Sequence, residues 1–82
     1  MISRNRITER YPDQEFLFAD GLDRAIIGVC DQSGRVIYSI ARIMKVLVKE
    51  GMTPQDAREH LEFNITGAYV GEQTPIFCDD EL

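Results

Sequence analysis

The chain has little of what most catalytic and metal sites are built from. Its 82 residues include no Trp, two Cys and a single His, His60. With one imidazole, no Ser-His-Asp or Cys-His arrangement can be assembled in which a base and an orienting group converge on a nucleophile. Two Cys and one His also lack the spacing of a zinc site. The sequence therefore predicts no catalytic residues, no metal site and no cofactor.

Long apolar runs are absent as well. No stretch approaches the roughly 20 apolar residues that a membrane-spanning helix needs, and the first residues, MISRNRITERYPDQ, contain no apolar core of a signal peptide. We therefore expect a cytoplasmic protein without membrane contact. In that reducing compartment Cys30 and Cys78, which lie among apolar neighbours, are expected to be small buried hydrophobes. A disulfide or a shared metal between them is the alternative.

The net charge of -5 is unevenly distributed along the chain. Residues 1–49 hold eight Lys/Arg and six Asp/Glu, a balance of +2, whereas residues 50–82 hold one Arg and eight Asp/Glu, a balance of -7. The acidic excess indicates either a solvated face that keeps the protein soluble or a surface that meets a basic partner. Direct nucleic-acid binding is disfavoured, because phosphate contact needs a basic patch.

A single domain is expected from this length, with residues 1–14 as a flexible N-terminal arm and residues 15–82 as an α+β unit. Residues 24–31 and 35–38 are rich in β-branched side chains, and the short Gly-containing segment between them predicts a hairpin. Residues 75–78 predict a last short strand. Residues 15–19 are either a strand or a cover for an apolar face.

Two helices are predicted between the hairpin and the last strand. The first begins after Ser39 as N-cap and ends before Gly51. Its apolar residues recur at helical spacing and form one face: Ile40, Ile43, Met44, Leu47 and Val48. The second helix begins with Thr53 as N-cap and Pro54 in the first turn. We expect it to end at Gly71, with Gly67 as the alternative.

The resulting order is β-β-α-α-β, which predicts a small antiparallel sheet with a helical hairpin packed on one face. The strands are apolar on both sides, and two helices can cover only one side. The second side therefore needs either the Phe16–Phe18 segment or another subunit. The second alternative predicts a homodimer or another protein partner.

Polar side chains gather where the second helix should give way to the last strand: Glu62, Asn64, Tyr69, Glu72 and Thr74. They are the candidate binding residues of the chain. One interpretation is a capping and hydrogen-bond network that fixes the turn; the other is a small recognition surface.

The run EFNITGAYVGEQTPIF, residues 62–77, resembles a family of small uncharacterised proteins encoded by tailed bacteriophages. Upstream the likeness continues through residues 25–29, Tyr38 and the Gly51-Met52 connection, so it covers about residues 22–77. The resemblance implies a phage origin and a role in the cytoplasm of an infected bacterium. It carries over no activity and no functional residues.

The function expected from the sequence is that of a non-enzymatic phage accessory protein that acts by protein–protein contact. Its partner would be a host protein, such as a defence or nucleic-acid-processing protein, which it inhibits or modulates. The alternative is a small-molecule or nucleotide-binding protein with a pocket near Tyr69–Thr74. A third hypothesis, an enzyme that uses carboxylates with a divalent metal, would depend on Glu62 and Glu72.

Overall fold

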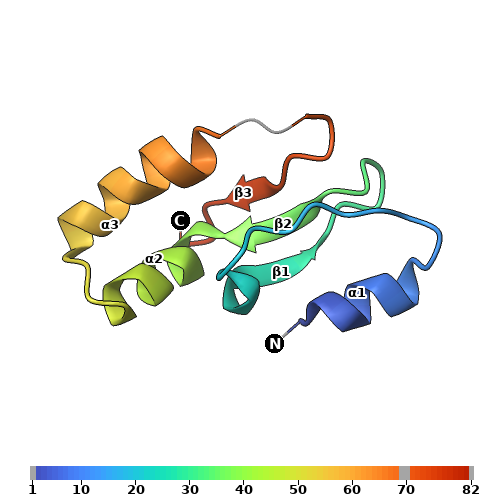
Figure 1. The fold of residues 1–82 in the computed structure, drawn as a ribbon, viewed down its shortest axis with the longest axis horizontal. Helices are drawn as coiled ribbons and strands as arrows, with labels where there is room; N and C mark the ends of the chain where they lie inside the picture. Colours follow the sequence, from blue (N-terminus) through green and yellow to red (C-terminus); the bar gives the residue numbers. More distant parts are fainter. Residues whose placement is uncertain (1, 69–70, 82) are drawn as a thin grey trace.

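The computed structural model describes residues 2–68 and 71–81 and shows an α+β fold (Figure 1). Its elements in chain order are α1 (Arg4–Arg10), η1 (Asp23–Ala25), β1 (Ile26–Val29), β2 (Val36–Ser39), α2 (Ile40–Lys49), α3 (Pro54–His60), η2 (Leu61–Thr66) and β3 (Ile76–Cys78). The predicted order β-β-α-α-β is present from β1 onward. A helix that the sequence analysis did not predict, α1, precedes it.

The predicted hairpin is confirmed. Strands β1 and β2 pair antiparallel, with Val29 opposite Val36 and a bulge between Ile26 and Gly28. The Gly34 N–H donates to the Cys30 carbonyl over 2.8 Å and closes the connecting turn. Gly34 has a φ of 69°, a left-handed conformation that favours glycine over any residue with a Cβ.

The third strand corrects the expected sheet. β3 pairs with β2 in parallel, Ile37 opposite Ile76, so the antiparallel prediction is wrong for this pair and the sheet is mixed. β3 lies beside β2 and runs in the same direction (Figure 1). There the Arg35 guanidinium donates to the Thr74 carbonyl and joins the residues that precede the two parallel strands.

The helix starts agree with the sequence. The Ser39 hydroxyl accepts from the Arg42 N–H over 3.1 Å, and the Thr53 hydroxyl accepts from the Asp56 N–H over 3.1 Å. Each hydroxyl satisfies a backbone donor that has no partner within its helix. The helix pair packs against the sheet at the end where β2 leads directly into α2 (Figure 1).

The end of the second helix differs from the expectation. After His60 the helix widens into the π-helical segment η2, which stops at Thr66 with Gly67 as its C-cap. A Cβ on Gly67 would lie 2.6 Å from the Glu62 carbonyl oxygen, closer than real contacts allow. The predicted end at Gly71 is therefore wrong; Gly71 lies in the following turn with a φ of 110°.

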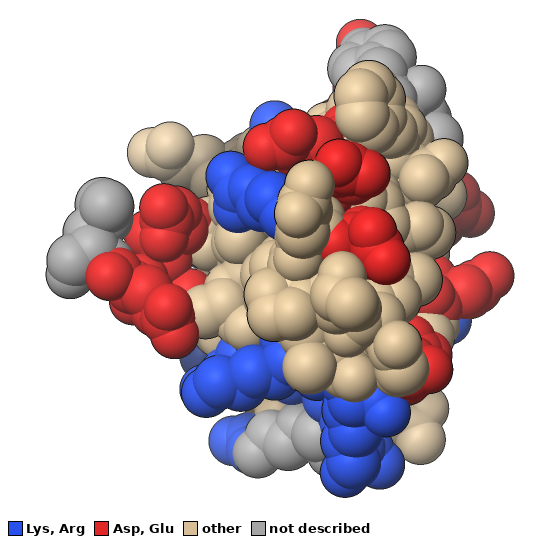
Figure 2. Space-filling view, turned by 90° about the vertical axis from the view of Figure 1, so that its left-hand side faces the viewer, with Lys and Arg blue, Asp and Glu red and all other residues tan. Residues whose placement is uncertain are grey.

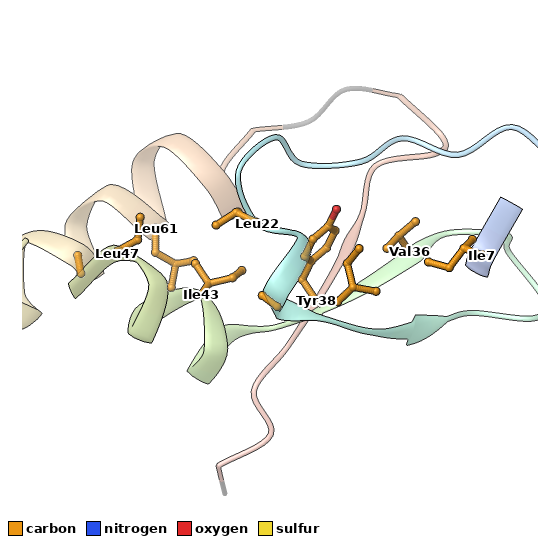
Figure 3. Close-up of a cluster of buried hydrophobic side chains, with 10 residues drawn as sticks. Ile7, Leu22, Val36, Tyr38, Ile43, Leu47 and Leu61 are labelled. Carbon is orange, nitrogen blue, oxygen red and sulfur yellow. The ribbon is translucent and has the colours of Figure 1, made fainter. Parts of the chain in front are cut away.

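The chain's own leading segment covers one face of the sheet. Tyr38 is fully buried, its hydroxyl accepts from the Ala19 N–H over 2.7 Å, and its ring stacks on Phe77 with centroids 5.9 Å apart. Phe16 and Phe18 pack on the same core, part of which Figure 3 shows. The internal segment considered as a cover therefore packs on the face of Tyr38 and Phe77, whereas Ile37 and Ile76 are half-buried on the opposite face.

Helix α1 occupies the segment that was expected to be a loose arm. Ile7 is 4% exposed and belongs to the core, and Ser3 caps the helix by accepting from the Arg6 N–H. Arg4 bonds Asp23 over 2.8 Å, and its guanidinium carbon lies 4.8 Å from the centre of the Phe18 ring. The apolar Ile7 and the cation of Arg4 thus attach α1 to the body of the domain. Among the described residues, no helix has the length and apolar character needed to cross a membrane.

Candidate functional site

Glu62 and Thr74 border a hollow of about 390 Å³ between η2 and the start of β3. Within it the Arg58 guanidinium bonds the Glu62 carboxylate over 3.1 Å, one helical turn away. The Thr74 hydroxyl donates to the Gly71 carbonyl over 2.7 Å, and Thr74 itself is 9% exposed. These contacts agree with the interpretation that Thr74 fixes the turn before β3.

The other predicted binding residues are not brought to this hollow. Asn64 borders a separate hollow of about 490 Å³ and lies with its amide nitrogen 3.3 Å from His60 Nδ1. Glu72 is exposed and lines neither hollow. Tyr69 lies outside the described residues. The described members of the predicted set therefore lie on different sides of the helix end and do not form one site.

Titratable groups with catalytic potential are dispersed. Among residues 2–68 and 71–81, no group of three or more His, Cys, Asp or Glu side chains could hold a metal ion. Cys30 and Cys78 are free thiols and half-buried, which differs from the expected full burial. A hydrogen bond from the Ser33 hydroxyl, aided by backbone donors of the same turn, lowers the pKa of the Cys30 thiol.

The apolar face of α2, which the sequence predicts as one continuous face, is divided in the structure between core and surface. Ile43 is 0% and Leu47 4% exposed, as expected for the core side of the helix. Val48 is 42% exposed, and Ile40 and Met44 are half-buried. Ile40, Met44 and Val48 follow one another at intervals of four residues, so they form a row along the helix. We call these three residues the α2 row.

Geometry explains why the predicted stripe divides. Apolar residues at i, i+3, i+4, i+7 and i+8 form a stripe around the helix, and here its two sides have different neighbours. α3 and η1 pack on the side of Ile43 and Leu47, where Leu22, Ala57 and Leu61 complete the core (Figure 3). The α2 row remains at the edge of that contact and reaches the molecular surface.

Charged residues border the α2 row on both sides. Together with Ala41 and Pro54 the row lines a shallow groove of about 740 Å³. Lys45 and Lys49 also line the groove, and so do Arg58, Asp79 and Glu81. Figure 2 shows this end of the molecule, with an uncharged area between Lys and Arg below and mostly Asp and Glu above and to the sides.

The acidic border of the groove is held by a contact to the start of α2. The buried Ser39 hydroxyl donates to Asp80 Oδ1 over 2.7 Å while it accepts from the Arg42 N–H. This hydrogen bond is the main reason why the pKa of Asp80 is lowered, and the nearby Ala41 N–H and the charge of Arg42 act in the same direction. The C-terminal segment is thereby attached beside the α2 row.

Two further large apolar side chains are exposed outside the row: Phe63 at 79% and Leu17 at 40%.

Comparisons with protein-family models, with curated proteins and with solved structures found no match to this chain. The functional inference therefore depends on the surface itself. Among the surface features of the described residues, the α2 row combines an apolar strip with charged borders on two sides.

Proposed function

We propose that this chain is a non-enzymatic accessory protein that acts by binding another protein through the α2 row. The observation that carries the proposal is that Ile40, Met44 and Val48 form an apolar row that lines a groove, with Val48 exposed and the other two half-buried. Isolated apolar residues on a surface are ordinary, whereas a contiguous apolar strip with a polar border is typical of protein contact sites. The likeness of residues 62–77 to tailed-phage proteins supports a partner from the host bacterium.

The sheet offers less apolar surface to a partner than the α2 row does. Residues 16–19 cover the face of Tyr38 and Phe77, and what remains on the other face is the short series of Ile37 and Ile76, both half-buried. The α2 row is longer: Ile40 and Val48 are eight positions apart, and at a rise of 1.5 Å per residue this separation is about 12 Å along the helix. Charges of both signs at its borders add orientation to an apolar contact.

The proposal is tested by replacing Val48 and, as a matched control, Leu17. Both are exposed to a similar extent, 42% and 40%, but Leu17 lies outside the groove. Tagged wild type, Val48→Gln and Leu17→Gln are used to capture proteins from lysate of the bacterial host, and captured proteins are then purified and titrated against each variant. We expect one protein that binds wild type and Leu17→Gln and loses most of its affinity for Val48→Gln.

Two results would count against this function: no host protein that binds the purified chain, or a partner that Val48→Gln binds as tightly as wild type does. Sedimentation of the purified chain alone gives a separate reading. A dimer that Val48→Gln dissociates would mean that the α2 row binds a second copy and is not free for a host protein.

Small-molecule binding beside Thr74 is the second candidate function. The hollow there, about 390 Å³, has a size typical of ligand sites. However, its two guanidinium groups already bind protein atoms, Arg58 the Glu62 carboxylate and Arg35 the Thr74 carbonyl. Because these donors are engaged within the chain, the hollow offers a ligand fewer polar contacts than its residue types suggest.

A further inference from the structure

A further hollow, of about 530 Å³, lies between η1 and α2, and half of its described lining residues are cations. Four basic residues border it: Arg24, Arg42, Lys45 and Lys49. Arg24 comes from η1 and the other three from α2. These two elements are in close contact. Lys and Arg side chains gather along the lower edge of the face in Figure 2, on the side where α2 lies in Figure 1. We call this hollow the basic hollow.

The positive charge of the basic hollow is only partly balanced within the described part of the chain, where the charge of Arg42 helps to lower the pKa of Asp80. None of its four cations takes part in the ion pairs found among residues 2–68 and 71–81, which join Arg4 to Asp20 and Asp23 and Arg58 to Glu62. Two carboxylates border the hollow, those of Asp23 and Glu50, and Asp23 is already bonded to Arg4.

Like charges on one helix face add to this excess. Lys45 follows Arg42 by three residues and Lys49 follows Lys45 by four, spacings at which side chains are neighbours and equal charges repel. An anion between them would relieve that repulsion. The concentration of unpaired cations is more notable because the chain as a whole has a net charge of -5.

We propose that the basic hollow binds a compact anion with several negative charges, of the di- or triphosphate class. Its volume lies in the range of small-ligand sites. Guanidinium groups bind phosphate oxygens in a planar, two-pronged geometry, and ammonium groups add point charges. The site is distinct from the α2 row, although Lys45 and Lys49 line both hollows.

A compact anion fits better than an extended nucleic acid. Among the described residues that line the basic hollow there is no aromatic ring on which a base could stack. A strand that continued beyond the hollow would meet the carboxylate of Glu50 at its border, and a net charge of -5 repels a long polyanion. A ligand whose charge is concentrated within the hollow avoids both costs.

Inorganic tripolyphosphate is the probe for this proposal, titrated calorimetrically into the full chain at low and at physiological salt. The double variant Arg24→Gln/Lys49→Gln removes one cation from each element of the hollow. The control Arg6→Gln/Arg10→Gln removes the same charge from exposed positions of α1. We expect wild type and control to bind, with affinity that falls as salt rises, and the hollow variant to bind about tenfold more weakly or worse.

Several results would overturn the proposal. The first is no binding at millimolar tripolyphosphate, and the second is equal binding by both double variants. The third is that a single-stranded oligonucleotide or a poly-glutamate peptide binds more tightly and is not displaced by tripolyphosphate. Circular dichroism and the thermal midpoint check that the exposed substitutions leave the fold intact. Val48→Gln should bind tripolyphosphate like wild type, so this site and the α2 row can fail independently.

Discussion

At the scale of single residues, Asp80 connects the C-terminal segment to the start of α2. Its carboxylate accepts from the buried Ser39 hydroxyl, and this bond lowers the pKa of Asp80 below that of an unfolded aspartate. A carboxyl group whose pKa is lower in the folded state binds protons more readily when unfolded. Its contribution to stability is therefore fully present above the unfolded pKa, about 3.9, and is lost as the pH falls through the folded pKa.

This linkage predicts how Asp80→Asn behaves with pH. We expect the variant to be less stable than wild type at pH 7, and the difference to shrink as the pH is lowered below about 4, where the wild-type carboxylate also becomes neutral. Urea unfolding at a series of pH values measures it. Asp79→Asn is the control, because the Asp79 carboxylate accepts from the Glu81 N–H instead of from the first turn of α2. A difference that does not change with pH would remove the charge of Asp80 from the explanation.

The role of a single residue can be predicted from the sequence when it acts locally, as Ser39, Thr53 and Gly51 do at the helix ends. Each acts through contacts within a few positions along the chain: a hydroxyl with a backbone N–H three residues later, or a φ of 111° after the last helical turn. Such local chemistry was predicted correctly. The bond between Ser39 and Asp80 joins residues 41 positions apart, and nothing in the local sequence indicates that pairing.

At the scale of elements, the end of η2 depends on the absence of a side chain. The helix was expected to continue to Gly71, because helical periodicity does not distinguish one glycine from the next. The widened turn of η2 places the Glu62 carbonyl against Gly67, and the Thr66 hydroxyl donates to the Leu61 carbonyl five residues earlier. Gly67 has a φ of -79°, so its backbone conformation is open to any residue and the constraint is contact alone.

Gly67→Ala is therefore expected to destabilise the protein by roughly 1–3 kcal/mol, because the added methyl would meet a backbone oxygen that cannot rotate away. Gly28→Ala is the matched control. A Cβ at Gly28 meets nothing within 4 Å, so its stability should stay within about 1 kcal/mol of wild type. Urea unfolding of both variants measures the effect. Equal stability of Gly67→Ala and wild type would mean that the end of η2 rearranges at little cost.

The apolar pattern of an element does not by itself determine which of its residues are buried. The apolar face of α2 was predicted correctly, but which part of it is buried depends on where α3 and η1 pack against it. Likewise the charged residues 1–14 gave no apolar period, yet one buried residue, Ile7, and one ion pair to Asp23 are enough to dock α1. These outcomes depend on neighbours distant in sequence, and periodicity alone could not predict them.

At the scale of the whole molecule, the direction of β3 is the main feature that the sequence left undetermined. A hairpin of two helices returns the chain toward its start, and a direct connection from there would have allowed an antiparallel strand. The residues directly before β3 instead form a turn, in which the Thr74 N–H donates to the Gly71 carbonyl, and β3 then follows beside Arg35 and parallel to β2. Three of the candidate binding residues flank this region and line two different hollows, Asn64 one of them and Glu62 and Thr74 the other.

The sheet order β1-β2-β3 makes a prediction about local opening. β2 is paired on both sides, so its amides should exchange with solvent only when the sheet opens, whereas α1 has seven residues and one buried side chain, Ile7. A helix that short is not stable by itself, so α1 can detach without the sheet. We expect native-state hydrogen exchange to protect the β2 amides that bond β1 and β3 most and the α1 amides least among the helices. Ile7→Ala should speed exchange in α1 far more than in β2. Equal protection of α1 and β2 would show instead that α1 opens only with the whole domain.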